Sequence, residues 1–184
     1  MAGVVLCGGA SRRMGTDKAL LVRDGRSWLA HAADRLVEAG AGPVLVATGT
    51  AGRIGPLRWD EVDDGDFRGC GPLAGIAAAL AASPHDLIAV LAVDLVQAEP
   101  DVLRWLVSIM RPDDRAVIPL DATGRAQPLH AIYAKSMHHP IADALVAGER
   151  RVLRVVEASG ARLVEMPAYL TSRAWSSNHN EPGS

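Results

Sequence analysis

The chain has 184 residues, of which 49 % are hydrophobic and 22 % are charged, and its formal net charge is −2. This balance is typical of a globular domain, excludes a charge-rich disordered chain, and provides no global basic field for binding nucleic acid. With two cysteines, no signal-peptide pattern and no membrane-spanning apolar run, the sequence argues against a disulfide scaffold and predicts a cytoplasmic protein that binds no membrane.

Short apolar runs alternate with amphipathic segments along the chain. We expect strands at residues 3–6, 44–46, 58–62, 86–93, 116–119, 129–133 and 162–165, and helices at 28–38, 72–82, 100–110, 139–147 and 151–158. Ser27 is a typical N-cap, Gly40 is typical after a helix end, and Pro72 suits a first helical turn. This alternation predicts an α/β fold with a mostly parallel sheet, whose ligands bind at the carboxyl ends of the strands.

The loop after the first expected strand is rich in glycine and positive charge. Between residues 6 and 18 it contains Gly8 and Gly9, followed by Arg13 and Lys18. Glycines allow backbone N–H groups to approach a phosphate, and the two cations would supply the charge that a triphosphate requires. The loop matches neither the Walker A pattern nor the dinucleotide fingerprint, so a turn whose cations are simply solvated is the alternative.

Asp94 directly follows the most apolar expected strand, residues 86–93. A carboxylate at the end of a buried strand can project into a cleft at the edge of the sheet. Magnesium usually binds one or two protein carboxylates and completes its coordination with phosphate oxygens and water, so this aspartate alone would suffice. The alternative is a helix-capping or surface residue ahead of Pro100.

The glycine-rich loop, read as Leu6-x-Gly8-Gly9-x3-Arg13-Met14-Gly15-x-Asp17-Lys18, resembles the opening signature of the MobA-like nucleotidyltransferases. Further segments are similar to motifs of that family, in the same order: Gly71-Pro72-Leu73-Ala74-Gly75, Asp94, the segment 147–152, and Asn178-x-Asn180-x-Pro182. Several segments in order over nearly the whole chain make this resemblance much more specific than a single motif.

The resemblance implies a Rossmann-like three-layer α/β/α sandwich similar to the nucleotide-diphospho-sugar transferases. It implies one nucleotidyltransferase domain over residues 1–184, with a nucleotide-binding half at about 1–100 and an acceptor-binding half at about 101–184. The motifs are most similar to the molybdenum cofactor guanylyltransferases, which implies transfer of GMP from GTP, with Mg²⁺, to the terminal phosphate of molybdopterin or its molybdenum form. Other proteins of molybdenum cofactor biosynthesis, or proteins that accept the cofactor, are the further partners that it suggests.

The same resemblance implies roles for individual residues. Arg13, Lys18 and Asp94 would be catalytic, with Asp94 as the metal ligand, and Asn178 and Asn180 would bind the acceptor. Nucleotide binding would involve Leu6, Cys7, Gly8, Gly9, Lys18, Asp64, Gly71, Pro72, Leu73 and Asp94. We also expect residues 175–180 to fold back over the sheet so that one asparagine amide reaches the cleft, against the alternative of a frayed tail.

Two positions depart from the family pattern. Ala47 stands where the family has an asparagine after its second strand, for which Thr48 or a water would substitute, and Val96 stands where a proline is common. These departures leave open a related enzyme that uses CTP or another phosphate acceptor, and a nucleotide-binding partner without catalytic activity.

Overall fold

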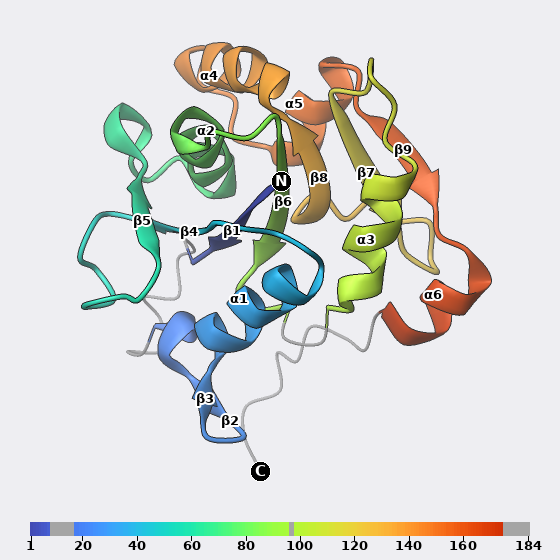
Figure 1. Ribbon diagram of the computed structural model, residues 1–184. Coiled ribbons are helices and arrows are strands. Elements are labelled where there is room, and N and C mark those ends of the chain that lie inside the picture. The colour runs from blue at the N-terminus through green and yellow to red at the C-terminus, as the bar shows by residue number, and fades with distance from the viewer. Residues whose placement is uncertain (8–16, 96–97, 175–184) are drawn as a thin grey trace.

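A mixed seven-stranded sheet forms the centre of the computed structural model, which describes residues 1–7, 17–95 and 98–174 (Figure 1). The strands are β1 (Ala2–Leu6), β4 (Val44–Gly49), β5 (Asp60–Asp63), β6 (Leu87–Ala92), β7 (Ala116–Leu120), β8 (His130–Ala134) and β9 (Arg162–Glu165), in the spatial order β5-β4-β1-β6-β8-β7-β9. Strand β8 is antiparallel to both of its neighbours, and all other neighbouring pairs are parallel. The predicted α/β fold with a mostly parallel sheet is confirmed.

Helices cover both faces of this sheet (Figure 1). On one face lie α1 (Trp28–Glu38), α3 (Pro100–Ser108) and α6 (Ala168–Ala174), and on the other lie α2 (Pro72–Ala82), α4 (His138–Val146) and α5 (Val152–Ala158). The predicted three-layer α/β/α sandwich is therefore confirmed, although α6 is not among the predicted helices. No helix within the described ranges is both long and apolar enough to cross a membrane.

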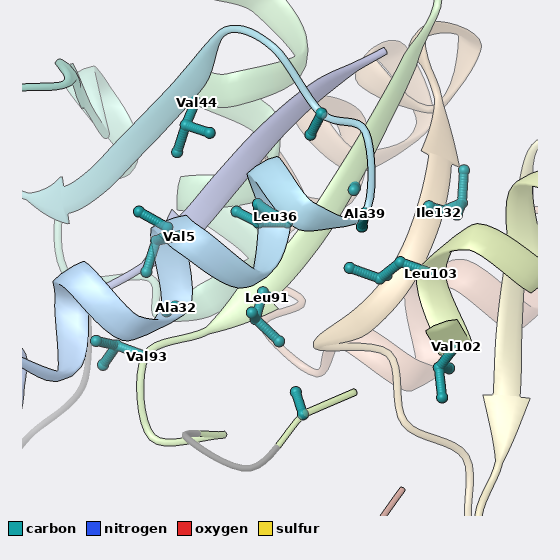
Figure 2. Close-up of a cluster of buried hydrophobic side chains, with 14 of the residues drawn as sticks. Val5, Ala32, Leu36, Ala39, Val44, Leu91, Val93, Val102, Leu103 and Ile132 are labelled. Atoms are coloured by element: carbon teal, nitrogen blue, oxygen red, sulfur yellow. The ribbon is translucent and has the colours of Figure 1, made fainter. Parts of the chain in front are cut away.

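Alternate side chains of strand β1 and of the residue that follows it enter two separate cores. Val4 and Leu6 belong to the core that contains α2, while Val5 and Cys7 belong to the core that contains α1. Figure 2 shows the second core, where side chains of β1, β6 and β8 meet those of α1 and α3. Because apolar side chains cover both faces, the polar groups of these strands reach solvent mainly at the strand ends.

The predicted bounds of the first two helices are confirmed by their end contacts. Ser27 Oγ accepts a hydrogen bond from Ala30 N–H at 3.1 Å, and Gly40 follows α1 with a φ of +89°. Helix α2 begins at Pro72 directly after Gly71, whose φ of +78° lies in the region that favours glycine. These signals act over a few residues, which is why the sequence alone could place both helices.

A small hairpin lies outside the predicted elements. Strand β2 (Val22–Arg23) pairs antiparallel with β3 (Arg26–Ser27) through Asp24 and Gly25, both of which have a positive φ. Two such residues are typical of a type I′ turn. The short 3₁₀ helices η2 (Lys18–Leu20), η3 (Gly65–Phe67) and η4 (Lys135–Met137) are likewise absent from the prediction.

Helix α2 approaches the sheet closely at Gly75. A Cβ added there would lie 3.0 Å from the Ala47 Cβ and 3.1 Å from Leu6 Cδ2. These distances are shorter than ordinary carbon–carbon contacts, so the absence of a side chain lets α2 rest directly on β1 and β4 near their carboxyl ends.

We expect Gly75→Ala to lower the free energy of unfolding, because adding a methyl group to a filled core costs about 1–3 kcal/mol. A gain in helix propensity of roughly 1 kcal/mol offsets part of that cost. Ala78→Gly, at a partly exposed position of the same helix, measures the difference in helix propensity between alanine and glycine without the packing effect. Urea unfolding provides the comparison, and a Gly75→Ala variant that is more stable than the wild type by the full helix-propensity difference would contradict the close approach.

Candidate functional site

The carboxyl ends of β1, β4 and β6 lie side by side because the three strands are parallel neighbours. Backbone hydrogen bonds continue this pairing beyond the strands: Val93 N–H donates to Leu6 O at 3.1 Å, and Cys7 N–H donates to Ala47 O at 2.8 Å. The segments that leave these strands therefore start from one edge of the sheet. In open α/β sheets, ligands bind at this edge.

Lys18 and Asp94, both predicted to be catalytic, are brought together at this edge. Lys18 Nζ lies 3.4 Å from Asp94 Oδ2, and the two side chains are 33 % and 40 % exposed. The preceding residue fixes the turn that carries Lys18, because Asp17 Oδ1 accepts a hydrogen bond from Ala19 N–H at 3.0 Å. An amine and a carboxylate that both remain open to solvent can bind phosphate oxygens and a cation, respectively.

Asp94 fits the requirements of a magnesium ion that is shared with a phosphate ligand. It follows the central strand β6 and keeps part of its carboxylate open, and such ions often use one protein carboxylate. In residues 1–7, 17–95 and 98–174, no three His, Cys, Asp or Glu side chains form a group that could hold a metal by themselves. These residues therefore fit a metal that depends on phosphate oxygens for most of its ligands.

Asp64 lies buried between β4 and helix α2. Its exposed fraction is 8 %. A Cβ added at Gly49 would lie 3.5 Å from Asp64 Oδ2, and a Cβ added at Gly75 would lie 3.8 Å from Asp64 Oδ1. Oδ1 accepts no hydrogen bond from the part of the chain that the structure describes. Burial raises the pKa of this carboxyl to about 6, and the negative charge of Asp63 adds to the increase. A buried carboxylate oxygen without a partner is costly, and such groups cluster at functional sites, but the nucleotide-binding role of Asp64 stays a prediction.

The segment Gly71-Pro72-Leu73, predicted to contact the nucleotide, forms the start of α2. Gly71 is exposed and Pro72 is half-buried, whereas Leu73 is fully buried in the core. A ligand at this helix start would therefore meet main-chain atoms of the first turn, and not the Leu73 side chain. The binding role of these residues stays a prediction.

Leu6 is the last residue of strand β1 and Cys7 follows it, and the two residues are 4 % and 5 % exposed. Burial raises the pKa of the Cys7 thiol to about 12, which keeps it protonated at neutral pH. Neither side chain can act as a charged ligand group. Any contact of these two residues with a nucleotide would come from main-chain atoms, and that role too stays a prediction.

Thr48 does not take the place of the family's asparagine. The Ala47 Cβ faces α2 at Gly75, and the next residue, Thr48, is 1 % exposed. The Thr48 hydroxyl lies 2.9 Å from Thr50 O and hydrogen-bonds the Glu61 carboxylate. Because this hydroxyl is used inside the protein, the expectation that it substitutes for the asparagine is wrong.

Several predicted residues lie outside the described ranges. They are Gly8, Gly9 and Arg13 in the first loop, and Asn178 and Asn180 within the predicted tail segment 175–180; Val96, a departure from the family pattern, lies outside these ranges as well. The roles implied for them by the family resemblance stay predictions.

Arg53 is a charged residue at the same edge that the sequence does not predict. Its loop between β4 and β5 carries no recognisable motif, and one of its partners is 46 residues away along the chain. The guanidinium donates to the Cys7 and Thr48 carbonyls and pairs with the Asp17 carboxylate. The pairing of β1 with β4 brings these groups together, so no local pattern in the sequence could have found them.

The chain matches a family model described as MobA-like NTP transferase domain over residues 3–163. It is 41 % identical over 157 residues to a protein of Opitutus terrae named "Probable molybdenum cofactor guanylyltransferase", covering 84 % of this chain and 73 % of that relative. A Mycobacterium marinum protein of the same name is 35 % identical over 173 residues, covering 90 % of this chain and 84 % of that relative.

Solved structures share the fold. Molybdopterin-guanine dinucleotide biosynthesis protein A from Archaeoglobus fulgidus has a TM-score of 0.75 at 24 % identity, covering 94 % of this chain and 86 % of that one. A Mycobacterium tuberculosis protein solved in complex with manganese has a TM-score of 0.67 at 23 % identity, covering 90 % of this chain and 86 % of that one. These likenesses confirm the fold.

Asp64 makes the stability of the protein depend on pH. Its native pKa is raised to about 6, whereas an aspartate in an unfolded chain has a pKa of about 3.9. Between these values the native state binds more protons, so the free energy of unfolding decreases as the pH rises, and the decrease ends once the pH has passed the native pKa of about 6. At neutral pH the full cost is about 3 kcal/mol.

We expect Asp64→Asn to remove this cost. The free energy of unfolding of the variant, minus that of the wild type, should increase by about 2–3 kcal/mol between about pH 4 and pH 7. Asp60→Asn removes an exposed carboxylate from β5 and controls for the loss of one negative charge. Urea unfolding across this range measures both differences, and a constant difference for Asp64→Asn would contradict the burial of an ionised carboxylate.

Proposed function

The chain belongs to the MobA-like NTP transferase family, and we propose that it transfers GMP from GTP to the terminal phosphate of molybdopterin or its molybdenum form. The products would be a guanine dinucleotide form of the cofactor and pyrophosphate. The names of the two relatives support this reaction. The observation in the structure that carries it is the Lys18–Asp94 pair, because it offers both signs of charge at the ligand-binding edge of the sheet.

The acceptor phosphate is largely ionised at neutral pH and can attack the α-phosphorus of GTP without a general base. A bond forms between its oxygen and the α-phosphorus, and the bond from that phosphorus to the oxygen that bridges to the β-phosphate breaks. The electron pair of the broken bond leaves with pyrophosphate. Catalysis then depends mainly on positioning and on charge stabilisation, as in related phosphoryl transfers.

Lys18 and Asp94 would stabilise the charges of the reaction in two different ways. The Lys18 ammonium is partly exposed and would stabilise the negative charge that grows on the departing pyrophosphate. Asp94 would hold Mg²⁺, and that ion would supply neutralisation of the phosphate charges. Before a nucleotide binds, each of the two side chains compensates the charge of the other.

The remaining predicted residues keep their roles within this proposal. Asp64 would accept hydrogen bonds from the nucleotide, and Arg13 would add positive charge beside the phosphates. Leu6, Cys7, Gly8, Gly9, Gly71, Pro72 and Leu73 would bind the nucleotide, and Asn178 and Asn180 would bind the acceptor. The division into a nucleotide-binding half and an acceptor-binding half, and contact with other proteins of molybdenum cofactor biosynthesis, belong to the same proposal.

Pyrophosphate release by the purified protein with Mg²⁺, GTP and molybdopterin tests the proposed function. Parallel reactions with CTP and ATP identify the base that the site selects. Release with CTP alone would favour the related enzyme with another nucleotide. Binding of GTP in calorimetry without any release would favour a nucleotide-binding partner that lacks catalytic activity.

We expect Asp94→Asn to lower the rate of transfer at least about 100-fold, because charge stabilisation by a bound metal is worth several kcal/mol. It should also abolish the dependence of GTP binding on Mg²⁺, while thermal unfolding stays unchanged because the side chain is 40 % exposed. Asp86→Asn makes the same exchange at an exposed position before the opposite end of β6 and should leave transfer unaffected. Near-normal transfer by Asp94→Asn would mean that another carboxylate holds the metal.

We expect Lys18→Ala to reduce kcat for transfer by about 10–100-fold and to weaken GTP binding much less, because its charge matters most as pyrophosphate departs. Lys18→Arg keeps the charge and should retain more of the activity than Lys18→Ala. Steady-state kinetics together with calorimetric binding of GTP separate the two effects. A variant that only raised KM would identify Lys18 as a docking group, and its proposed catalytic role would be wrong.

A further inference from the structure

Arg53 joins three chain segments through three different nitrogens. Its Nε donates to Thr48 O at 2.6 Å, its Nη2 donates to Cys7 O at 2.6 Å, and its Nη1 pairs with Asp17 Oδ2. These acceptors lie on β4, directly after β1, and directly before the turn η2. A planar guanidinium presents its donors in fixed directions, so three such contacts define one relative position of the three segments.

The loop that carries Arg53 is itself held by the sheet. Ala51 N–H donates to Asp63 Oδ2 at 3.0 Å, and Gly52 N–H donates to Glu61 Oε2 at 2.9 Å. Both carboxylates belong to β5, which pairs with β4. Arg53 therefore projects from a fixed backbone toward its three acceptors.

Asp17 connects Arg53 to Lys18. One oxygen of the Asp17 carboxylate pairs with Arg53, and the other accepts the Ala19 N–H that closes the turn around Lys18. Lys18 Nζ in turn reaches Asp94 after β6. A continuous series of polar contacts therefore runs along the carboxyl edge, from the β4–β5 loop past the end of β1 to the end of β6.

We propose that Arg53 is a positioning residue that, through Asp17, holds the turn bearing Lys18 at the place where Lys18 meets Asp94. The inference rests on the proposed function, in which Lys18 acts on the phosphates of the nucleotide. Each of the three guanidinium nitrogens of Arg53 donates to a protein acceptor, and in this proposal Arg53 acts without touching the substrate. A displacement of about 1 Å in a reacting group can cost roughly 100-fold in rate, so losing this restraint affects mainly turnover.

Arg53→Ala and Asp17→Asn test the two ends of the contact, and Arg58→Ala is the matched control. Arg58 is a 68 % exposed arginine that pairs with Asp34 and stacks on Trp59, so its removal changes the net charge equally. Asp17→Asn keeps an oxygen that can accept the Ala19 N–H but loses the charge that pairs with Arg53. We expect kcat/KM for GTP to fall about 10–100-fold in Arg53→Ala and about 10-fold in Asp17→Asn, mostly through kcat, with Arg58→Ala unchanged.

The double variant distinguishes positioning from direct contact with the nucleotide. If Arg53 acts through Asp17, adding Asp17→Asn to Arg53→Ala causes no loss beyond that of Arg53→Ala alone. Losses that multiply would identify two independent roles and would overturn the proposal. Arg53→Lys should restore little activity, since one ammonium cannot engage three acceptors that lie in different directions, and full activity in this variant would also overturn it.

Hydrogen exchange of the peptide 17–27 separates this inference from the proposed reaction, because the measurement needs no substrate. We expect exchange to be at least about 5-fold faster in Arg53→Ala and Asp17→Asn, with Arg58→Ala like the wild type. Equal exchange in all variants overturns the positioning role of Arg53 even if the wild type transfers GMP. The opposite outcome is also possible: the variants show the expected differences in exchange, but the wild type transfers no GMP from GTP. That result would refute the proposed function and leave the restraint by Arg53 in place.

Discussion

A sheet that is apolar on both faces leaves its carboxyl edge as the place where parallel strands can gather polar groups. Strands β1, β4 and β6 run in the same direction as neighbours, and the two helical layers remove their faces from water. Lys18, Arg53 and Asp94 are far apart in the sequence, yet each follows or adjoins one of these strand ends. The site therefore depends on the strand order more than on any single loop.

The charged groups at this edge differ in how far the protein compensates their charge. Each guanidinium nitrogen of Arg53 donates to a protein acceptor, and Lys18 and Asp94 neutralise each other while both stay partly exposed. Asp64 is different, because Oδ1 has no partner in the described part of the chain and burial raises the pKa of the carboxyl to about 6. A ligand that donates hydrogen bonds to Asp64 would relieve this cost, so it would gain more binding free energy there than at a group that the protein already satisfies.

The extent to which the sequence predicts this structure depends on the range of each interaction. The first residues of helices α1 and α2 were predictable because Ser27 and Pro72 act on the next few residues. The antiparallel direction of β8 was not predictable from the sequence, because a short apolar run has the same pattern in either direction. At the site, Lys18 and Asp94 follow from family motifs, whereas the contacts of Arg53 exist only once β1 and β4 have paired.

The departure at Ala47 has a packing reason that bears on the choice of base. Its Cβ faces Gly75 so closely that a larger side chain would meet α2, and the neighbouring Thr48 hydroxyl is engaged with Glu61. Under the proposed function, polar recognition of a base in this part of the edge would fall to Asp64, to the backbone at the start of α2, or to a bound water. A carboxylate accepts two hydrogen bonds in parallel, and guanine presents two adjacent N–H donors on its pairing edge, whereas cytosine presents its amino group beside an acceptor. A site that relies on an ionised Asp64 thus favours guanine over cytosine, even without the asparagine of the family.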